Sequence, residues 1–117
     1  MDKKYKNTKY ELVIEFRSCH RKKKRFERLL SNACLDSYGR WKLHNEINKL
    51  NEKIIELYPN ILEWLKSIEG SIAKPVMTEI VIFMKEKKEV AFLLDLEYKQ
   101  VTDAYRREMH KLKLVEV

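Results

Sequence analysis

The sequence predicts an all-α protein, and three observations lead to this fold class. The chain of 117 residues is 37% charged and 44% apolar, with 2 glycines and 2 prolines, a composition that favours long helices over sheets. Apolar side chains recur at steps of three and four residues, the period of a helix with one buried face. Breaks fall at Pro59 and Gly70. We expect an N-terminal helical hairpin followed by a C-terminal unit of three helices.

The same breaks divide the chain into three predicted segments. Residues 1–8 are lysine-rich and polar and form a basic tip that we expect to be disordered. Residues 9–70 form the hairpin and a short third helix, and residues 71–117 form the C-terminal unit. Cys19 and Cys34 fall on apolar helix faces, so we expect buried, reduced thiols.

The first predicted helix, from Lys9 to about Asn32, has two unlike faces. Its apolar face carries Leu12, Phe16, Cys19, Phe26 and Leu30. The opposite face is a row of cations, here called the basic stripe: Arg17, Arg21, Lys22, Lys24, Arg25 and Arg28. Residues 1–32 hold 11 Lys or Arg against 4 Asp or Glu, whereas the remaining residues hold 14 of each sign. The net charge of +7 therefore belongs to this helix and its tail, which predicts a polyanionic partner.

The second predicted helix, from about Arg40 to Leu57, carries an apolar seam. The seam consists of Leu43, Ile47, Leu50, Ile54 and Leu57, spaced by four and three residues. It fits an antiparallel hairpin with the first helix, and it also fits a homodimer through the Leu43–Leu57 seam. We expect Pro59 to end or kink this helix, and residues 60–68 to form the short third helix.

The segment from Glu89 to Arg107 fits a helix-turn-helix. Ala91 supplies the small residue that a close helix crossing needs, and the turn would be residues 95–97, short as the motif requires. Leu94, Leu96, Val101 and Ala104 supply the apolar positions. Asp95 would take the left-handed backbone conformation that glycine often provides, and Tyr98 stands where Ser or Thr is usual. The other interpretation of this segment is two ordinary helices of a bundle.

A recognition helix would run from Tyr98 to about Lys111. Its DNA-binding candidates are Lys99, Gln100, Thr102, Arg106, Arg107 and Lys111. Arg and Gln side chains can make the paired hydrogen bonds that distinguish guanine and adenine in the major groove. Lys99, Arg107 and Lys111 are better suited to phosphate contacts.

The run IVIFMKEKKEVAFLLDLEYKQVTDAYRREMHKL resembles the C-terminal end of small phage-encoded transcription regulators of the late-gene activator type. The resemblance covers about residues 76–112. It implies a helix-turn-helix similar to the promoter-recognition region of sigma factors, with a recognition helix that ends in a basic segment.

Two functions follow as hypotheses. The first is a small DNA-binding transcription regulator, encoded by a phage or mobile element, that binds duplex DNA through the helix-turn-helix and the basic stripe. The alternative is a helical interaction module that binds and modulates a host nucleic-acid enzyme, with host RNA polymerase or another acidic protein surface as partner.

The sequence predicts neither an enzyme nor a metal or cofactor site. His20, His44 and His110 lack the spacing of metal ligands, and the two isolated glycines form no phosphate-binding loop. The chain carries no apolar run of membrane-spanning length and no signal-peptide pattern. We therefore expect a cytoplasmic protein with no membrane partner.

Overall fold

The computed structural model describes residues 9–32 and 34–115, and that part of the chain contains five helices and no strand. The helices are α2 (Lys9–Leu30), α3 (Ser37–Ser67), α4 (Ala73–Val81), α5 (Lys87–Leu94) and α6 (Tyr98–Val115). The predicted all-α class is confirmed. The predicted basic tip, residues 1–8, lies outside the described residues.

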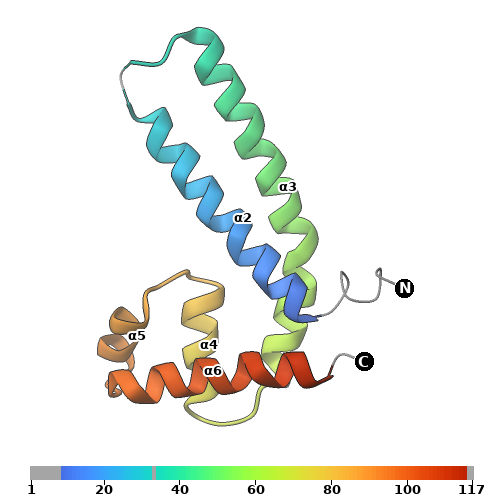
Figure 1. Ribbon diagram of the computed structural model, residues 1–117, viewed down its shortest axis with the longest axis vertical. Coiled ribbons are helices and arrows are strands. Elements are labelled where there is room, and N and C mark those ends of the chain that lie inside the picture. The colour runs from blue at the N-terminus through green and yellow to red at the C-terminus, as the bar shows by residue number, and fades with distance from the viewer. Residues whose placement is uncertain (1–8, 33, 116–117) are drawn as a thin grey trace.

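Helices α2 and α3 run antiparallel and side by side, and the segment joining them lies at the far end of the molecule from α6 (Figure 1). Phe16 of α2 is buried, and its ring stacks on that of Tyr58 of α3 at 6.2 Å between centroids. Ile47 and Leu57 of the predicted seam are buried within this one chain, so a homodimer through the same seam stays a prediction.

The joining segment sets where α3 begins. Asp36 caps α3, because its Oδ1 accepts a hydrogen bond from the backbone N–H of Gly39 at 2.7 Å. This bond satisfies one of the amides that a first helical turn leaves without a helical partner. Cys34 lies exposed in this segment, so the expectation of buried thiols was right for Cys19 and wrong for Cys34.

The predicted break at Pro59 was wrong, because α3 continues through this proline to Ser67. The residues that would have formed a separate third helix belong to the last turns of α3. Ile61, Trp64 and Leu65 are at most 5% exposed there, and burying three large side chains contributes about 1.5–3 kcal/mol each. That contribution outweighs the roughly 3 kcal/mol that a proline costs inside a helix.

One continuous core joins the lower end of the α2–α3 pair to the three C-terminal helices. On the C-terminal side its fully buried members are Val76, Met77, Ile80 and Val81 of α4, Val90 of α5, and Val101 and Ala104 of α6. Val13 and Phe16 of α2 belong to the same cluster. Since α2 and the C-terminal helices share this core, the basic stripe is held in a fixed position beside them.

A three-residue turn connects α5 to α6. Asp95 has a left-handed backbone, with φ 56° and ψ 48°, and the N–H of Leu96 donates to the carbonyl of Ala91 at 2.9 Å. This pattern satisfies carbonyls that the end of α5 would otherwise leave free. At the start of α6, the Gln100 side chain accepts a hydrogen bond from the N–H of Glu97 at 2.9 Å. The turn is therefore closed by bonds on both sides.

Candidate nucleic-acid interface

The basic stripe is exposed except at Arg17. Arg21, Lys22, Lys24, Arg25 and Arg28 are all exposed on α2. Arg17 is half-buried, because α6 packs against α2 at this point. Its Nη1 donates a hydrogen bond to the Tyr105 hydroxyl, and its guanidinium carbon lies 5.4 Å from the centroid of that ring. Of Arg17, Arg21, Lys24 and Arg28, which we expected to share one exposed face, Arg17 is therefore only half exposed.

The environment of Arg17 leaves part of its hydrogen-bonding capacity unused. Burial lowers the pKa of Arg17 below its ordinary value, the Tyr105 charge opposes that shift, and neighbouring Arg21 adds to it. The Nε atom of Arg17 is buried and has no hydrogen-bond partner among the described residues. An unsatisfied buried donor of a charged group is costly, so an anionic acceptor at this position would stabilise the side chain.

The predicted recognition residues lie on the outer part of α6, and three of them have acidic neighbours. Arg106 Nη1 lies 3.4 Å from Asp103, Arg107 Nε lies 3.8 Å from Glu108, and Lys111 Nζ lies 3.2 Å from Glu108. The Arg106–Asp103 pair is exposed and therefore weak, so Arg106 can exchange its carboxylate for another acceptor at little cost. Glu108 is buried, so its pairs with Arg107 and Lys111 are more costly to give up.

The three other candidates, Lys99, Gln100 and Thr102, lie in the first turns of α6. The side chains of Gln100 and Thr102 are hydrogen-bonded to the backbone. Lys99 is exposed, and its carbonyl accepts a hydrogen bond from the Thr102 hydroxyl at 3.0 Å. Gln100 is exposed but caps the helix, so it can read a base only by giving up its bond to Glu97.

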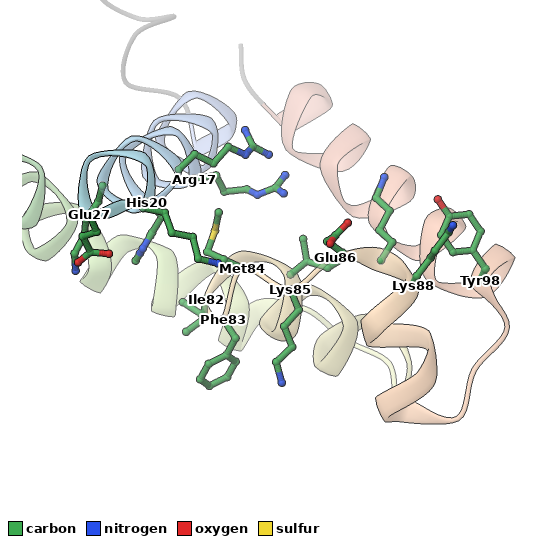
Figure 2. A pocket seen from close by; sticks show the side chains of 15 residues that line it. Arg17, His20, Glu27, Ile82, Phe83, Met84, Lys85, Glu86, Lys88 and Tyr98 are labelled. Carbon is green, nitrogen blue, oxygen red and sulfur yellow. The ribbon is translucent and has the colours of Figure 1, made fainter. Parts of the chain in front are cut away.

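A hollow lies between α2 and the segment that connects α4 to α5. It has a volume of about 780 Å³, and we call it the basic groove. One wall carries Arg17, Arg21, Lys23 and Lys24 of α2, and the other carries Lys85, Lys87 and Lys88. Figure 2 shows Arg17, His20 and Glu27 on the α2 side, with Lys88 and Tyr98 at the other end. Against these seven cations, the lining contains two carboxylates, those of Glu27 and Glu86. The Lys85 ammonium is in addition paired with Glu79 at 3.0 Å, and in Figure 2 its side chain points away from α2.

A second hollow of about 630 Å³ continues the basic groove along α6. The two hollows share Lys87 and Tyr98 in their linings. The second adds Tyr10, Tyr105, Arg106 and Lys113, together with polar and apolar neighbours. Lysine ammonium groups lie over two of these rings, at 4.5 Å for Lys87 over Tyr105 and 5.0 Å for Lys113 over Tyr10. Cations interleaved with tyrosines are typical of surfaces that bind nucleic acid.

His20 is the titratable group on the floor of the basic groove. Burial lowers its pKa below the ordinary value, and the nearby Lys23 ammonium lowers it further. Its ring meets that of Phe16 edge to face at 4.7 Å. A lowered pKa makes His20 neutral at pH 7, so it adds no charge to the seven cations.

Sequence reasoning found one wall of the basic groove and missed the other. Nothing in the spacing of the lysines from Lys85 to Lys88 indicates that this segment lies across a groove from α2. Tyr98, Tyr105 and Tyr10 were likewise absent from the predicted site. The signal that could have suggested them is the pairing of a cationic run with nearby tyrosines, which is weak without a tertiary structure.

Within the described residues, no three His, Cys, Asp or Glu side chains gather closely enough to hold a metal ion. None of the helices in that part of the chain has the length and apolar character needed to cross a membrane. Comparisons of the chain with family models, curated proteins and solved structures found no match.

Proposed function

We propose that this protein is a small DNA-binding transcription regulator, carried by a phage or mobile element, in which α5 and α6 act as a helix-turn-helix on duplex DNA. The α5–α6 pair supports this function. Its turn spans three residues, Asp95 is left-handed, and Ala91 is 8% exposed where α5 packs on α6. A small residue at this contact is what the motif requires, since the two helices cross closely there.

The observation that carries the proposal is the basic groove. Its two cationic walls come from segments about 60 residues apart in the sequence, and the fold holds them against each other. Like charges repel, so this arrangement destabilises the folded chain unless an anion offsets it. A nucleic-acid backbone is a polyanion that can meet several of these cations at once.

In this proposal the outer face of α6 reads bases while the groove and the basic stripe meet phosphate. Arg106 has a side chain that is 77% exposed, so it can enter a major groove without disturbing the core. Lys99, Arg107 and Lys111 lie on the same helix and are suited to phosphate contacts. Host RNA polymerase would be the protein partner of a regulator of this kind.

A second candidate function rests on the far end of the hairpin. Tyr38 and Trp41 are 66% and 59% exposed there, and their rings stack at 6.1 Å. Tyr, Trp and Arg are the residues most often central to protein interfaces, and Arg40 lies between these two in the sequence. This end of the hairpin favours the alternative, a helical module that binds an acidic surface of a host nucleic-acid enzyme.

The decisive experiment isolates genomic DNA fragments bound by the protein and then measures Arg106→Ala on a selected and a random duplex. We expect this variant to lose roughly 1–3 kcal/mol of affinity for the selected duplex and much less for the random one. Stability should not change, because the side chain is exposed.

Lys66→Ala serves as the matched control, since it removes an exposed cation from α3 outside both hollows. Equal losses for Arg106→Ala on the two duplexes would indicate a phosphate contact in place of base reading. Failure to select any fragment, or a selected duplex that Arg106→Ala binds as tightly as the unchanged protein does, would contradict the helix-turn-helix function.

A further inference from the structure

The start of α6 is unusual because an aromatic residue stands at its first position. Tyr98 is 50% exposed and lines both hollows. A duplex-reading helix usually begins with a small polar residue, so Tyr98 weakens that function while it adds an aromatic surface to the groove. We propose that the basic groove binds one single strand of nucleic acid, with its phosphates between α2 and residues 85–88 and one base stacked on Tyr98.

Arg17 and Lys87 both line the basic groove, and their cationic groups lie 5.4 Å and 4.5 Å from the centroid of the Tyr105 ring, which lines the second hollow. The two cationic groups are therefore at most about 10 Å apart. A duplex is wider than its major groove of about 12 Å, so a whole duplex does not fit between them.

Arg17 supplies a specific contact for that backbone. Its Nη1 is bonded to Tyr105, and its side chain forms part of the lining of the groove. A phosphate oxygen is the acceptor that a guanidinium prefers. Arg21, Lys24 and Lys88 are exposed along the rim, where they can meet the neighbouring phosphates.

The chemistry of the site resembles what single-strand binding requires in general. Such sites combine a cationic channel for the backbone with an aromatic face on which bases stack without regard to sequence. The faces of Tyr105 and Tyr10 have lysine ammonium groups over them. Half-exposed Tyr98, which carries no such contact among the described residues, is therefore the ring available to a base.

The test measures fluorescence anisotropy at low salt with a labelled DNA strand of about 12 nucleotides, a length typical of single-strand sites, and with the duplex of that strand. We expect Tyr98→Ala to weaken single-strand binding roughly 5- to 150-fold, the equivalent of one lost base stack. Tyr98→Phe should bind the strand as the unchanged protein does, because it keeps the ring. Binding of the random duplex should change less than about twofold in both variants.

Tyr38→Ala is the matched control, since it removes an exposed tyrosine at the far end of the hairpin, and it should bind the strand normally. The inference is overturned if the unchanged protein ignores the single strand, or if Tyr98→Ala binds it as Tyr38→Ala does. It is also overturned if Tyr98→Phe loses as much affinity as Tyr98→Ala, because the hydroxyl would then be the contact.

Two further measurements assign the strand and separate this inference from the proposed function. The affinity for an RNA strand of the same sequence is compared with that for the DNA strand, and the tighter of the two shows which sugar the groove prefers. Tight binding of either strand supports the inference. If the protein binds the single strand through Tyr98 but binds no duplex, the single-strand inference is supported and the proposed duplex-binding function is contradicted. If the protein selects duplex fragments and does not bind single strands, the proposed function is supported and the single-strand inference is contradicted.

Discussion

Within residues 9–32 and 34–115, two residues other than glycine take left-handed backbone conformations, and they stand on either side of α5. Met84 has φ 56° in the segment before α5, and Asp95 has φ 56° directly after it. This conformation costs roughly 1–2 kcal/mol for a residue with a β-carbon, and less for Asp and Asn, whose short polar side chains bond locally. The position of α5 against α6 therefore depends on what residue 95 can tolerate.

Substitution of Asp95 tests this dependence. We expect Asp95→Ala to lower the free energy of unfolding by about 1 kcal/mol, since alanine keeps the β-carbon and loses the polar side chain. Asp95→Gly should be at least as stable as the unchanged protein, because glycine adopts φ > 0 without steric cost. Urea denaturation measures both.

The control for this pair is Glu63→Ala, which removes an exposed carboxylate from the last two turns of α3, where the backbone is helical. Its free energy of unfolding should change by less than about 0.5 kcal/mol. If Asp95→Ala proved as stable as Asp95→Gly, the left-handed turn between α5 and α6 would be contradicted.

Among the elements, α3 shows how packing overrides a local preference. Its 31 residues include Pro59, which cannot donate a backbone hydrogen bond. Ile55, whose carbonyl loses that donor, is 71% exposed, so water can reach this part of the helix. The buried side chains on both sides of Pro59 keep the two halves of α3 in one helix.

We therefore expect Pro59→Ala to stabilise the protein. Alanine restores the missing N–H and removes a ring clash, which is worth up to about 3 kcal/mol, reduced by the roughly 0.4–1 kcal/mol of chain entropy that proline removes from the unfolded state. The free energy of unfolding should rise by about 1–2 kcal/mol. Asn60→Ala, at the exposed neighbouring position, should change it by less than 1 kcal/mol. A loss of stability in Pro59→Ala would mean that α3 is interrupted at this proline.

Helix α6 has a different task on each of its sides. Val101 and Ala104 face the core, Tyr98 and Tyr105 face the groove, and Arg106 is largely exposed. The same helix can therefore serve a base-reading surface and a groove wall. Arg106 and Tyr98 both line the second hollow, so their variants are distinguished by the ligand measured: a selected duplex for Arg106→Ala and a single strand for Tyr98→Ala.

At the scale of the whole molecule, the sequence predicts what depends on neighbouring residues. The recurrence of apolar side chains at steps of three and four residues predicted the all-α class, and the pattern from Ala91 to Ala104 predicted the short turn after α5. Continuity through Pro59 could not be predicted, because it depends on the burial of Ile61 and Trp64 by other helices. The contact of Arg17 with Tyr105 joins residues 88 positions apart, a relation that no local pattern encodes.

In the candidate site, too, features set by neighbouring residues can be predicted from the sequence and features set by tertiary contacts cannot. The basic stripe is visible in the sequence because its cations recur on one helix face. The basic groove is not, since it exists only where the fold brings residues 85–88 and Tyr98 beside α2. Figure 1 makes the reason plain: the antiparallel α2–α3 pair rises beside the three C-terminal helices, and α2 is the member nearer to α5.

The central claim is that cations of the basic groove bind a nucleic-acid backbone, and its most direct test is the salt dependence of DNA affinity. The variant replaces Arg21, Lys24 and Lys88 by Gln, since all three are exposed and line the groove. The control replaces Lys42, Lys49 and Lys66 by Gln, which removes the same charge from exposed positions of α3.

Each phosphate contact contributes about 0.9 to the slope of log affinity against log salt for duplex DNA and about 0.7 for a single strand, and the slope is measured with both. We expect the groove variant to lower the magnitude of that slope by roughly 2–3, and the α3 control to leave it unchanged. Both should melt as the unchanged protein does, because exposed charges contribute little to stability. Equal slopes for the groove variant and the α3 control would contradict the account, because the groove would then make no phosphate contact.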